Sequence, residues 1–252
     1  RNQEPLRKLT LVKNTVVTVG RVSVDLYGLE AGASFGGDQT FSKSVGGSPS
    51  NVAVAAAKLG NKTVLLTKVG ADPLGRYIVE KLKSWGVDTT YVSVEPNGLT
   101  PVVLAALDPP EDPKLIFHRQ PNAPDTTIDS ASVPQDLIEN CGVFWMSGCA
   151  LSTGATAKSS FEWLEKRGRK KHTVIDLDYR PSFWSSMQDA GVAARAAIAN
   201  CSVVVGNRTE CEMAIGLTDP DQIADKLLGD GVSLAIVKLG ADGVMLATAD
   251  ER

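Results

Sequence analysis

Residues 45–53 read Val-Gly-Gly-Ser-Pro-Ser-Asn-Val-Ala, and the order of residue types predicts a tight loop that opens an α-helix. The glycine pair supplies flexible backbone, Ser48 suits the residue that caps the helix, and Pro49 suits its first turn. Alanines follow at positions 53, 55, 56 and 57, so the helix can pack closely on its neighbours, and Gly60 suits its left-handed end. Free amides at a helix start attract polar or anionic ligands. The stretch is therefore either a ligand site or an ordinary close-packed loop.

Short β-branched runs alternate with helical patterns along the rest of the chain. Nearly continuous apolar strands are typical of a parallel sheet that is buried on both faces. The alternation predicts one α/β domain over residues 1–252, with a doubly wound, mainly parallel sheet flanked by helices. The expected strands are 15–19, 63–69, 143–146, 173–176, 202–205 and 234–237, and the expected helices are 49–59, 76–85, 156–166, 192–199, 209–215 and 221–228.

Two stretches, residues 38–46 and 91–119, break this alternation. Both contain short runs in which polar and apolar residues alternate, and a proline-rich turn at 108–113 interrupts the second. We expect them to form a small antiparallel β flap on one edge of the sheet. Such a flap could act as a lid over a ligand at the carboxyl ends of the main strands.

Composition and charge exclude several classes of function. The 252 residues include 26 basic and 29 acidic side chains, a net charge of −3, so a nucleic-acid partner is not expected. Four cysteines without a C-x-x-C pair, and two histidines, give poor support to a zinc site or a disulfide framework, and buried reduced thiols are expected. No apolar run approaches the ~20 residues that span a bilayer. Residues 1–14 lack a signal-peptide core, so we expect a cytoplasmic protein without a membrane partner.

Two common nucleotide motifs are absent from the sequence. The chain has no G-x-x-x-x-G-K-[ST], which excludes a Walker P-loop. It also has no G-x-G-x-x-G after the first strand, which removes the main support for a nicotinamide-dependent oxidoreductase.

Five segments nevertheless resemble, in the same order, the motifs of the ribokinase-like (PfkB) carbohydrate kinases. They are Gly-Arg-Val-Ser-Val-Asp at 20–25, Gly-Gly-x-x-x-Asn at 46–51 with its alanine-rich helix, Gly-Ala-Asp-Pro-Leu-Gly at 70–75, Asn-Arg-Thr-Glu at 207–210 and Lys-Leu-Gly-Ala-Asp-Gly at 238–243. One such match would carry little weight, but five in order are specific. The resemblance implies a sugar kinase with ATP and Mg²⁺ as cofactors.

Two further stretches, residues 40–49 and 176–184, resemble the branch of this family that acts on 5-dehydro-2-deoxygluconate in inositol catabolism. That resemblance implies ATP-dependent phosphorylation of the terminal hydroxyl of a sugar acid, with 5-dehydro-2-deoxy-D-gluconate converted to its 6-phosphate. Many relatives, including 2-keto-3-deoxygluconate kinases, carry asparagine where Asp178 stands. A 2-keto-3-deoxygluconate kinase and a fructokinase or ribokinase type of enzyme therefore remain alternatives.

The resemblance implies a substrate site that includes Asp25, Gly46, Gly47, Asn51 and Asp178. Asp25 and Asn51 suit sugar hydroxyls, because a carboxylate accepts hydrogen bonds and an amide both donates and accepts them.

Three cations could serve the acid group of the substrate. Lys43 and Arg119 could pair with a carboxylate, since a guanidinium fork matches it bidentately, or both could be solvated flap residues. Arg180 is a further candidate, although it could instead lock the loop at 176–178 by ion pairing.

The nucleotide is expected at residues Asn207, Glu210, Lys238, Gly240 and Gly243. The resemblance implies that Glu210 also serves the metal indirectly, through water, although an acid in the first turn of a helix is favoured for dipole reasons alone.

One hallmark of the family is missing from the 252 residues. Its glycine-rich G-A-G-D segment supplies the aspartate that acts as general base and the amides that form an anion hole. We therefore expect the C-terminal part of the domain to be absent from this sequence, and we name no catalytic residue. Asp242 lies in the preceding loop and is no substitute. The gap keeps a second function open, a non-catalytic sugar-acid binding protein on the same fold. Relatives also often form a homodimer through the flap, whose exposed strand edges invite pairing.

Overall fold

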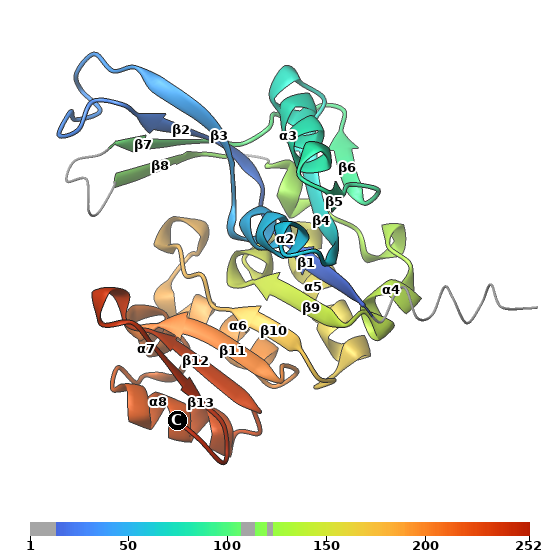
Figure 1. The fold of residues 1–252 in the computed structure, drawn as a ribbon, viewed down its shortest axis with the longest axis vertical. Coiled ribbons are helices and arrows are strands. Elements are labelled where there is room, and N and C mark those ends of the chain that lie inside the picture. Colours follow the sequence, from blue (N-terminus) through green and yellow to red (C-terminus); the bar gives the residue numbers. More distant parts are fainter. Residues whose placement is uncertain (1–13, 107–113, 120–122) are drawn as a thin grey trace, which may run out of the picture.

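The computed structural model describes residues 14–106, 114–119 and 123–252, and its centre is one large β-sheet (Figure 1). The strand order is β13-β12-β11-β10-β9-β1-β4-β5, and β6 also pairs with β4. All pairs are parallel except β12 with β13. The strands are β1 (Thr15–Val19), β4 (Lys62–Gly70), β5 (Val87–Asp88), β6 (Val92–Glu95), β9 (Val143–Ser147), β10 (Thr173–Asp176), β11 (Val203–Asn207), β12 (Leu234–Lys238) and β13 (Val244–Ala247).

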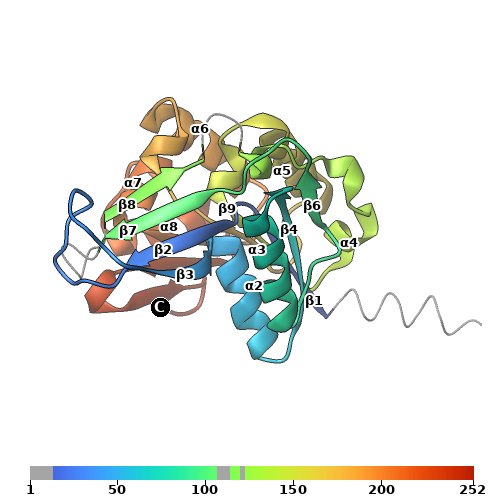
Figure 2. The ribbon, with the colours of Figure 1, turned by 90° about the horizontal axis from the view of Figure 1, so that it is seen from above.

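Helices cover both faces of this sheet, which confirms the predicted fold class. On one face α2 and α3 pack on β4, and on the other α5 to α8 pack on the strands from β1 to β12 (Figure 2). The helices are α2 (Ser48–Lys58), α3 (Pro73–Ser84), α4 (Gln135–Asn140), α5 (Gly154–Arg167), α6 (Met187–Ile198), α7 (Arg208–Ile215) and α8 (Pro220–Gly229). None of the helices in the described part of the chain combines the length and apolar composition needed to cross a bilayer.

Two helices begin three or more residues earlier than predicted because capping residues set their first turns. Asp72 accepts from the amide of Gly75 at 2.8 Å, so α3 starts three residues before the expected position. Ser186 accepts from the amide of Asp189 at 3.1 Å, so α6 starts five residues before it. Neither cap is followed at once by an apolar period, and the pattern alone therefore placed both starts too late.

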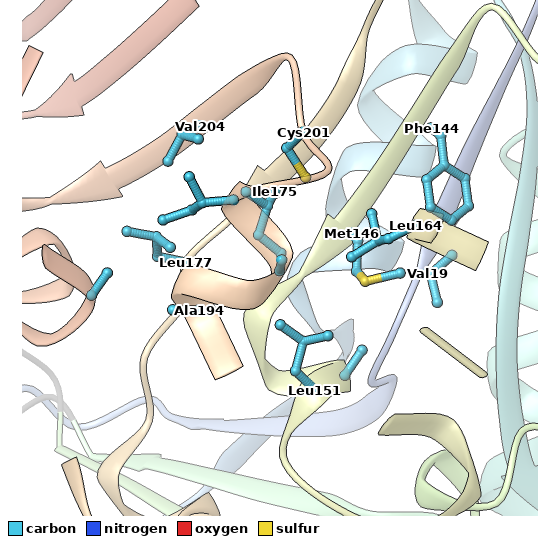
Figure 3. Close-up of a cluster of buried hydrophobic side chains, with 14 of the residues drawn as sticks. Val19, Phe144, Met146, Leu151, Leu164, Ile175, Leu177, Ala194, Cys201 and Val204 are labelled. Atoms are coloured by element: carbon cyan, nitrogen blue, oxygen red, sulfur yellow. The ribbon is translucent and has the colours of Figure 1, made fainter. Parts of the chain in front are cut away.

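The largest buried cluster lies between the sheet and α5 to α8 (Figure 3). Phe144 and Met146 from β9 and Ile175 from β10 meet Leu164 of α5, and all four are essentially without solvent contact. This packing holds the main strands rigidly, so the residues that follow their carboxyl ends are fixed relative to one another.

The flap is a separate sheet of order β3-β2-β7-β8, and it stands away from the main sheet in Figure 1. Its strands are β2 (Ser23–Gly28), β3 (Phe41–Gly46), β7 (Val102–Ala106) and β8 (Lys114–His118). Two pairings are antiparallel and β2 with β7 is parallel. The expected flap range 91–119 is divided by the structure, because β6 joins β4 in the main sheet.

The turn before α2 differs from the prediction in one respect. Gly47 with φ of 106° is the capping residue, and Ser48 is the first residue of the helix and does not cap it. Glycine is required there, because a Cβ at position 47 would lie 2.3 Å from the carbonyl oxygen of Arg21. Gly60 has φ of 86° just after the helix, as predicted.

The order of the strands places a topological switch at β1. The chain passes from β1 to β4 and β5 on one side and returns to β9 on the other. Ligands of open α/β sheets bind beyond the carboxyl ends of strands at such a switch. The start of α2 and the ends of β1, β9 and β10 are therefore the place to look for a site.

Candidate active site

Asp25 and Gly46 are brought together by the pairing of β2 with β3. Residue 46 faces Ser23 in this ladder, and a Cβ at position 46 would lie 1.9 Å from Oδ2 of Asp25. The carboxylate of Asp25 therefore fills the space that any side chain at position 46 would need. Ser23 donates to Oδ1 of Asp25 at 2.6 Å, which fixes the direction of the carboxylate.

Gly47 and Asn51 belong to the first turn of α2. The carbonyl of Gly47 accepts from the Ser50 hydroxyl at 2.8 Å and from the Asn51 amide at 3.0 Å. The Asn51 side chain is exposed and lines a groove of about 330 Å³ with Ser44 and Trp85. No contact joins it to Asp25 among the described residues, so their joint role at one sugar stays a prediction.

Asp178 joins three elements at the switch point. Its buried carboxylate accepts from the hydroxyl of Ser48 in α2 and, at 2.8 Å, from that of Ser147 at the end of β9. Burial acts to raise the pKa of Asp178, but Arg180 and the two hydroxyls outweigh it and hold the pKa below its usual value. Its φ of 34° is left-handed, a conformation that aspartate tolerates better than most residues.

Arg180 pairs with this carboxylate, with 3.1 Å between Nη2 and Oδ1 of Asp178. The pair agrees with the loop-locking alternative. The arginine side chain is still 42% exposed, so it also faces solvent beside the switch point.

Lys43 does not lie on the side of the flap that carries Asp25. It is opposite Leu26 in the β2–β3 ladder, whereas Asp25 is opposite Ser44, and successive strand residues point to opposite faces. Its ammonium stands over the ring of Tyr77 in α3 at 4.0 Å from the ring centre. We therefore leave Lys43 out of the proposed site.

Arg119 is buried and already has an anionic partner. It forms an ion pair with Asp125, and its guanidinium lies over the ring of Phe183 at 4.2 Å. Burial raises the pKa of Asp125 despite the nearby guanidinium. The pairing anchors the end of β8 to the segment before α4, so Arg119 is not a free carboxylate receptor.

The predicted nucleotide residues gather at the ends of β11 and β12. Asn207 and Glu210 form a reciprocal capping box at the start of α7, with bonds of 2.8 and 2.7 Å. Lys238 reaches Glu210 at 3.3 Å and Asp176 at 3.1 Å. Burial acts to lower the pKa of Lys238, but the two carboxylates raise it above its usual value.

The loop after β12 carries the remaining two predicted residues. Gly240 and Gly243 have φ of 64° and 98° and flank a single helical turn over 240–242. Both glycines are exposed, so their backbones can be approached closely from outside.

Several residues of the site were not predicted, namely Arg21, Ser23, Ser48, Ser147 and Asp176. A signal existed for two of them, because Arg21, Ser23 and Asp25 alternate as residues on one face of a strand do. Arg21 is buried and donates to the hydroxyl of Ser23 at 2.8 Å. The others depend on which strand ends meet in space.

Comparison with known proteins agrees with this geometry. Residues 13–252 match the model of the pfkB family carbohydrate kinase. The 5-dehydro-2-deoxygluconokinase of Geobacillus thermodenitrificans (strain NG80-2) is 31% identical over 240 residues, which cover 92% of this chain and 70% of that protein. A 5-dehydro-2-deoxygluconokinase of Bacillus anthracis is 32% identical over 244 residues, covering 93% and 73%.

Solved structures share the fold at lower sequence identity. The fructokinase of Halothermothrix orenii has a TM-score of 0.81 at 22% identity, covering 94% of this chain and 84% of its own. An uncharacterised sugar kinase from Pyrococcus horikoshii in complex with ATP has a TM-score of 0.76 at 21% identity, covering 92% and 74%.

Proposed function

The chain belongs to the pfkB family of carbohydrate kinases, and from this premise we propose that it uses ATP to phosphorylate the terminal hydroxyl of a sugar acid. Family membership confirms the prediction of a carbohydrate kinase, which is a phosphotransferase. The proposed substrate is 5-dehydro-2-deoxy-D-gluconate, with its 6-phosphate as product. The names of the relatives at 31% and 32% identity support this choice.

The observation that carries the sugar site is the carboxylate of Asp25 held against Gly46. A carboxylate in a fixed direction accepts hydrogen bonds from sugar hydroxyls, and glycine at position 46 leaves the space that this carboxylate occupies. The start of α2 lies beside it, where amide groups favour polar or anionic atoms. Flap closure would exclude water from the transferring phosphate, and the transfer itself would be in line.

The nucleotide would bind beyond the carboxyl ends of β11 and β12, near Asn207, Lys238 and the loop of Gly240 and Gly243. Lys238 offers a cation to phosphate oxygens, and the glycine backbone allows their close approach. The solved complex of the similarly folded Pyrococcus horikoshii protein with ATP supports ATP as the nucleotide.

The residues near Lys238 fit a magnesium ion that is held mainly by phosphates and water. No group of three or more histidine, cysteine, aspartate or glutamate side chains gathers in the described part of the chain. Glu210 would contact the ion through a water molecule, because Mg²⁺ usually keeps several of its water ligands. When bound, Mg²⁺ neutralises charge on the phosphates. We assign no residue of this chain as the general base.

Two further parts of the proposal concern the setting of the enzyme. We place it in the cytoplasm, and we retain the homodimer through the flap as a prediction. Exposed apolar side chains on the flap, among them Phe41, Leu115 and Ile116, support an association through this sheet. Light scattering of the protein and of a Leu115→Lys variant would test it.

The test of the function is an ADP-release assay on the full-length gene product with 5-dehydro-2-deoxygluconate, 2-keto-3-deoxygluconate, fructose and ribose. We expect the highest kcat/KM with the first compound. A higher value with fructose or ribose would refute the substrate, and no ADP release with any of the four would refute the kinase proposal. The Asp25→Ala variant tests the sugar site. We expect calorimetry to show weaker sugar binding and nearly unchanged ATP binding.

A further inference from the structure

Arg21 is a buried cation that makes no direct ion pair within the described residues, although its charge acts to lower the pKa of the Asp125 and Asp178 carboxyls from a longer distance. Its residue is 8% exposed, and it lies directly after Gly20 at the carboxyl end of β1. Its one hydrogen bond goes to the neutral hydroxyl of Ser23, and within the described ranges it takes part in no ion pair. A buried charge is costly unless it is paired or fully hydrogen-bonded.

Other arginines of the described chain have direct partners. Arg119 pairs with Asp125, and Arg180 pairs with Asp178. Arg167 has no carboxylate, but it donates to the Thr173 hydroxyl and to three backbone carbonyls. Arg21 differs because in this part of the chain it has no direct ion pair and a single side-chain hydrogen bond, and it reaches carboxylates only through Ser23 or over a longer distance.

The unused donors of Arg21 face accessible space. A guanidinium carries five N–H groups, and Ser23 takes one of them. The buried side-chain nitrogens without a partner include Nε of Arg119 and of Arg180 but no nitrogen of Arg21. The free groups of Arg21 are therefore open to a ligand, although the residue as a whole is enclosed.

The surroundings hold the guanidinium of Arg21 beside Asp25. The guanidinium carbon of Arg21 lies 5.2 Å from the ring centre of Phe117 and 6.0 Å from that of Phe183, which limit its movement. Ser23 links it to Asp25 through bonds of 2.8 and 2.6 Å. Arg21, which can bind an anion, and Asp25, which can bind a hydroxyl, are therefore both bonded to Ser23.

We propose that Arg21 binds the carboxylate of the sugar-acid substrate while Asp25 binds a hydroxyl a few bonds along the same molecule. The inference rests on the proposed function and adds the residue that selects acids over neutral sugars. The acid supplies a direct ion-pair partner for Arg21, with the planar fork of the guanidinium matching the two carboxylate oxygens. A neutral sugar offers no such partner, so it should bind more weakly.

The test compares wild type with Arg21→Met by calorimetry against 5-dehydro-2-deoxygluconate and a matched pair of probes, gluconate and sorbitol. Gluconate and sorbitol differ at the carbon that carries the acid. We expect wild type to prefer gluconate and the variant to bind both acids about 10- to 100-fold more weakly, with sorbitol binding unchanged. Arg76→Met, which removes an exposed charge from α3, is the control and should keep the preference.

Thermal unfolding without ligand separates this role from a structural one. Because Arg21 makes no direct ion pair with the described residues, replacing it by methionine should leave Tm nearly unchanged. A large fall in Tm, or failure of the variant to fold, would show that Arg21 serves the packing of Phe117 and Phe183 and would overturn the inference. Arg21→Lys keeps the charge without the fork and should recover part of the preference.

The role of Arg21 and the proposed kinase function can be refuted separately. Equal preference for gluconate in wild type and Arg21→Met would overturn the inference and leave the kinase proposal intact. Wild type that binds neither the acids nor the sugars would refute the proposed function itself.

Discussion

Replacing Gly46 by alanine should act almost entirely through Asp25. The three atoms nearest to a Cβ at position 46 all belong to Asp25, at 1.9, 2.1 and 2.2 Å. Such overlap forces the carboxylate to move, which breaks its 2.6 Å bond from Ser23. Overpacking in a well-filled site costs about 1–3 kcal/mol, and we expect Gly46→Ala to lose that much free energy of unfolding. Urea denaturation followed by tryptophan fluorescence would measure it.

A double-mutant cycle isolates the contact between residues 46 and 25. In an Asp25→Ala background the obstructing atoms are gone, so Gly46→Ala should be nearly neutral, or stabilising by about 0.4–1 kcal/mol through the unfolded chain. The coupling between the two changes should then be about 1–3 kcal/mol. Gly47→Ala is the contrasting control, because its obstruction is the backbone of Arg21 and no side-chain change relieves it. Additive effects of Gly46→Ala and Asp25→Ala would refute the reasoning.

Three other predictions follow from the same structure. Asp178→Ala should lower the free energy of unfolding by about 1.5–3 kcal/mol, and Asp178→Asn should lower it less because asparagine also tolerates positive φ. The folded pKa of Asp178 lies below its unfolded value of 3.8, so its stabilising contribution is present above pH 3.8 and is lost as the pH falls through the folded pKa. An acid titration in which Asp178→Asn loses stability with the same slope as wild type would contradict this prediction. Burial and the nearby carboxylate of Asp25 raise the pKa of Tyr27, so Asp25→Ala should lower it in an absorbance titration, and an unchanged value would mean that the two groups are not neighbours. Burial raises the pKa of Cys141 to about 11 and of Cys201 and Cys211 to about 12, so these thiols should react with a disulfide reagent only after unfolding in urea, and rapid native labelling would show them to be exposed.

The sequence by itself determined the main elements of the fold. Apolar β-branched runs with helical patterns between them reproduce the six expected strands and helices to within a few residues, because burial on both faces of a sheet demands that composition. The left-handed glycine at position 60 could also be predicted, because it follows an alanine-rich helix. Short strands such as β5 and β6 were not, because a few residues carry no period.

Tertiary structure alone decided which polar groups share a site. Lys43 lies in β3 and Arg119 directly follows β8, but strand alternation and a partner at Asp125 determine where their charges point. Asp178 meets Ser48, 130 residues earlier, only because α2 and β10 both reach the switch point beside β1. The lack of a direct ion pair between Arg21 and the other described residues likewise depends on which residues surround it in space. Sequence fixes each side chain's chemistry, whereas the pairing of charges depends on distances between segments that are remote along the chain.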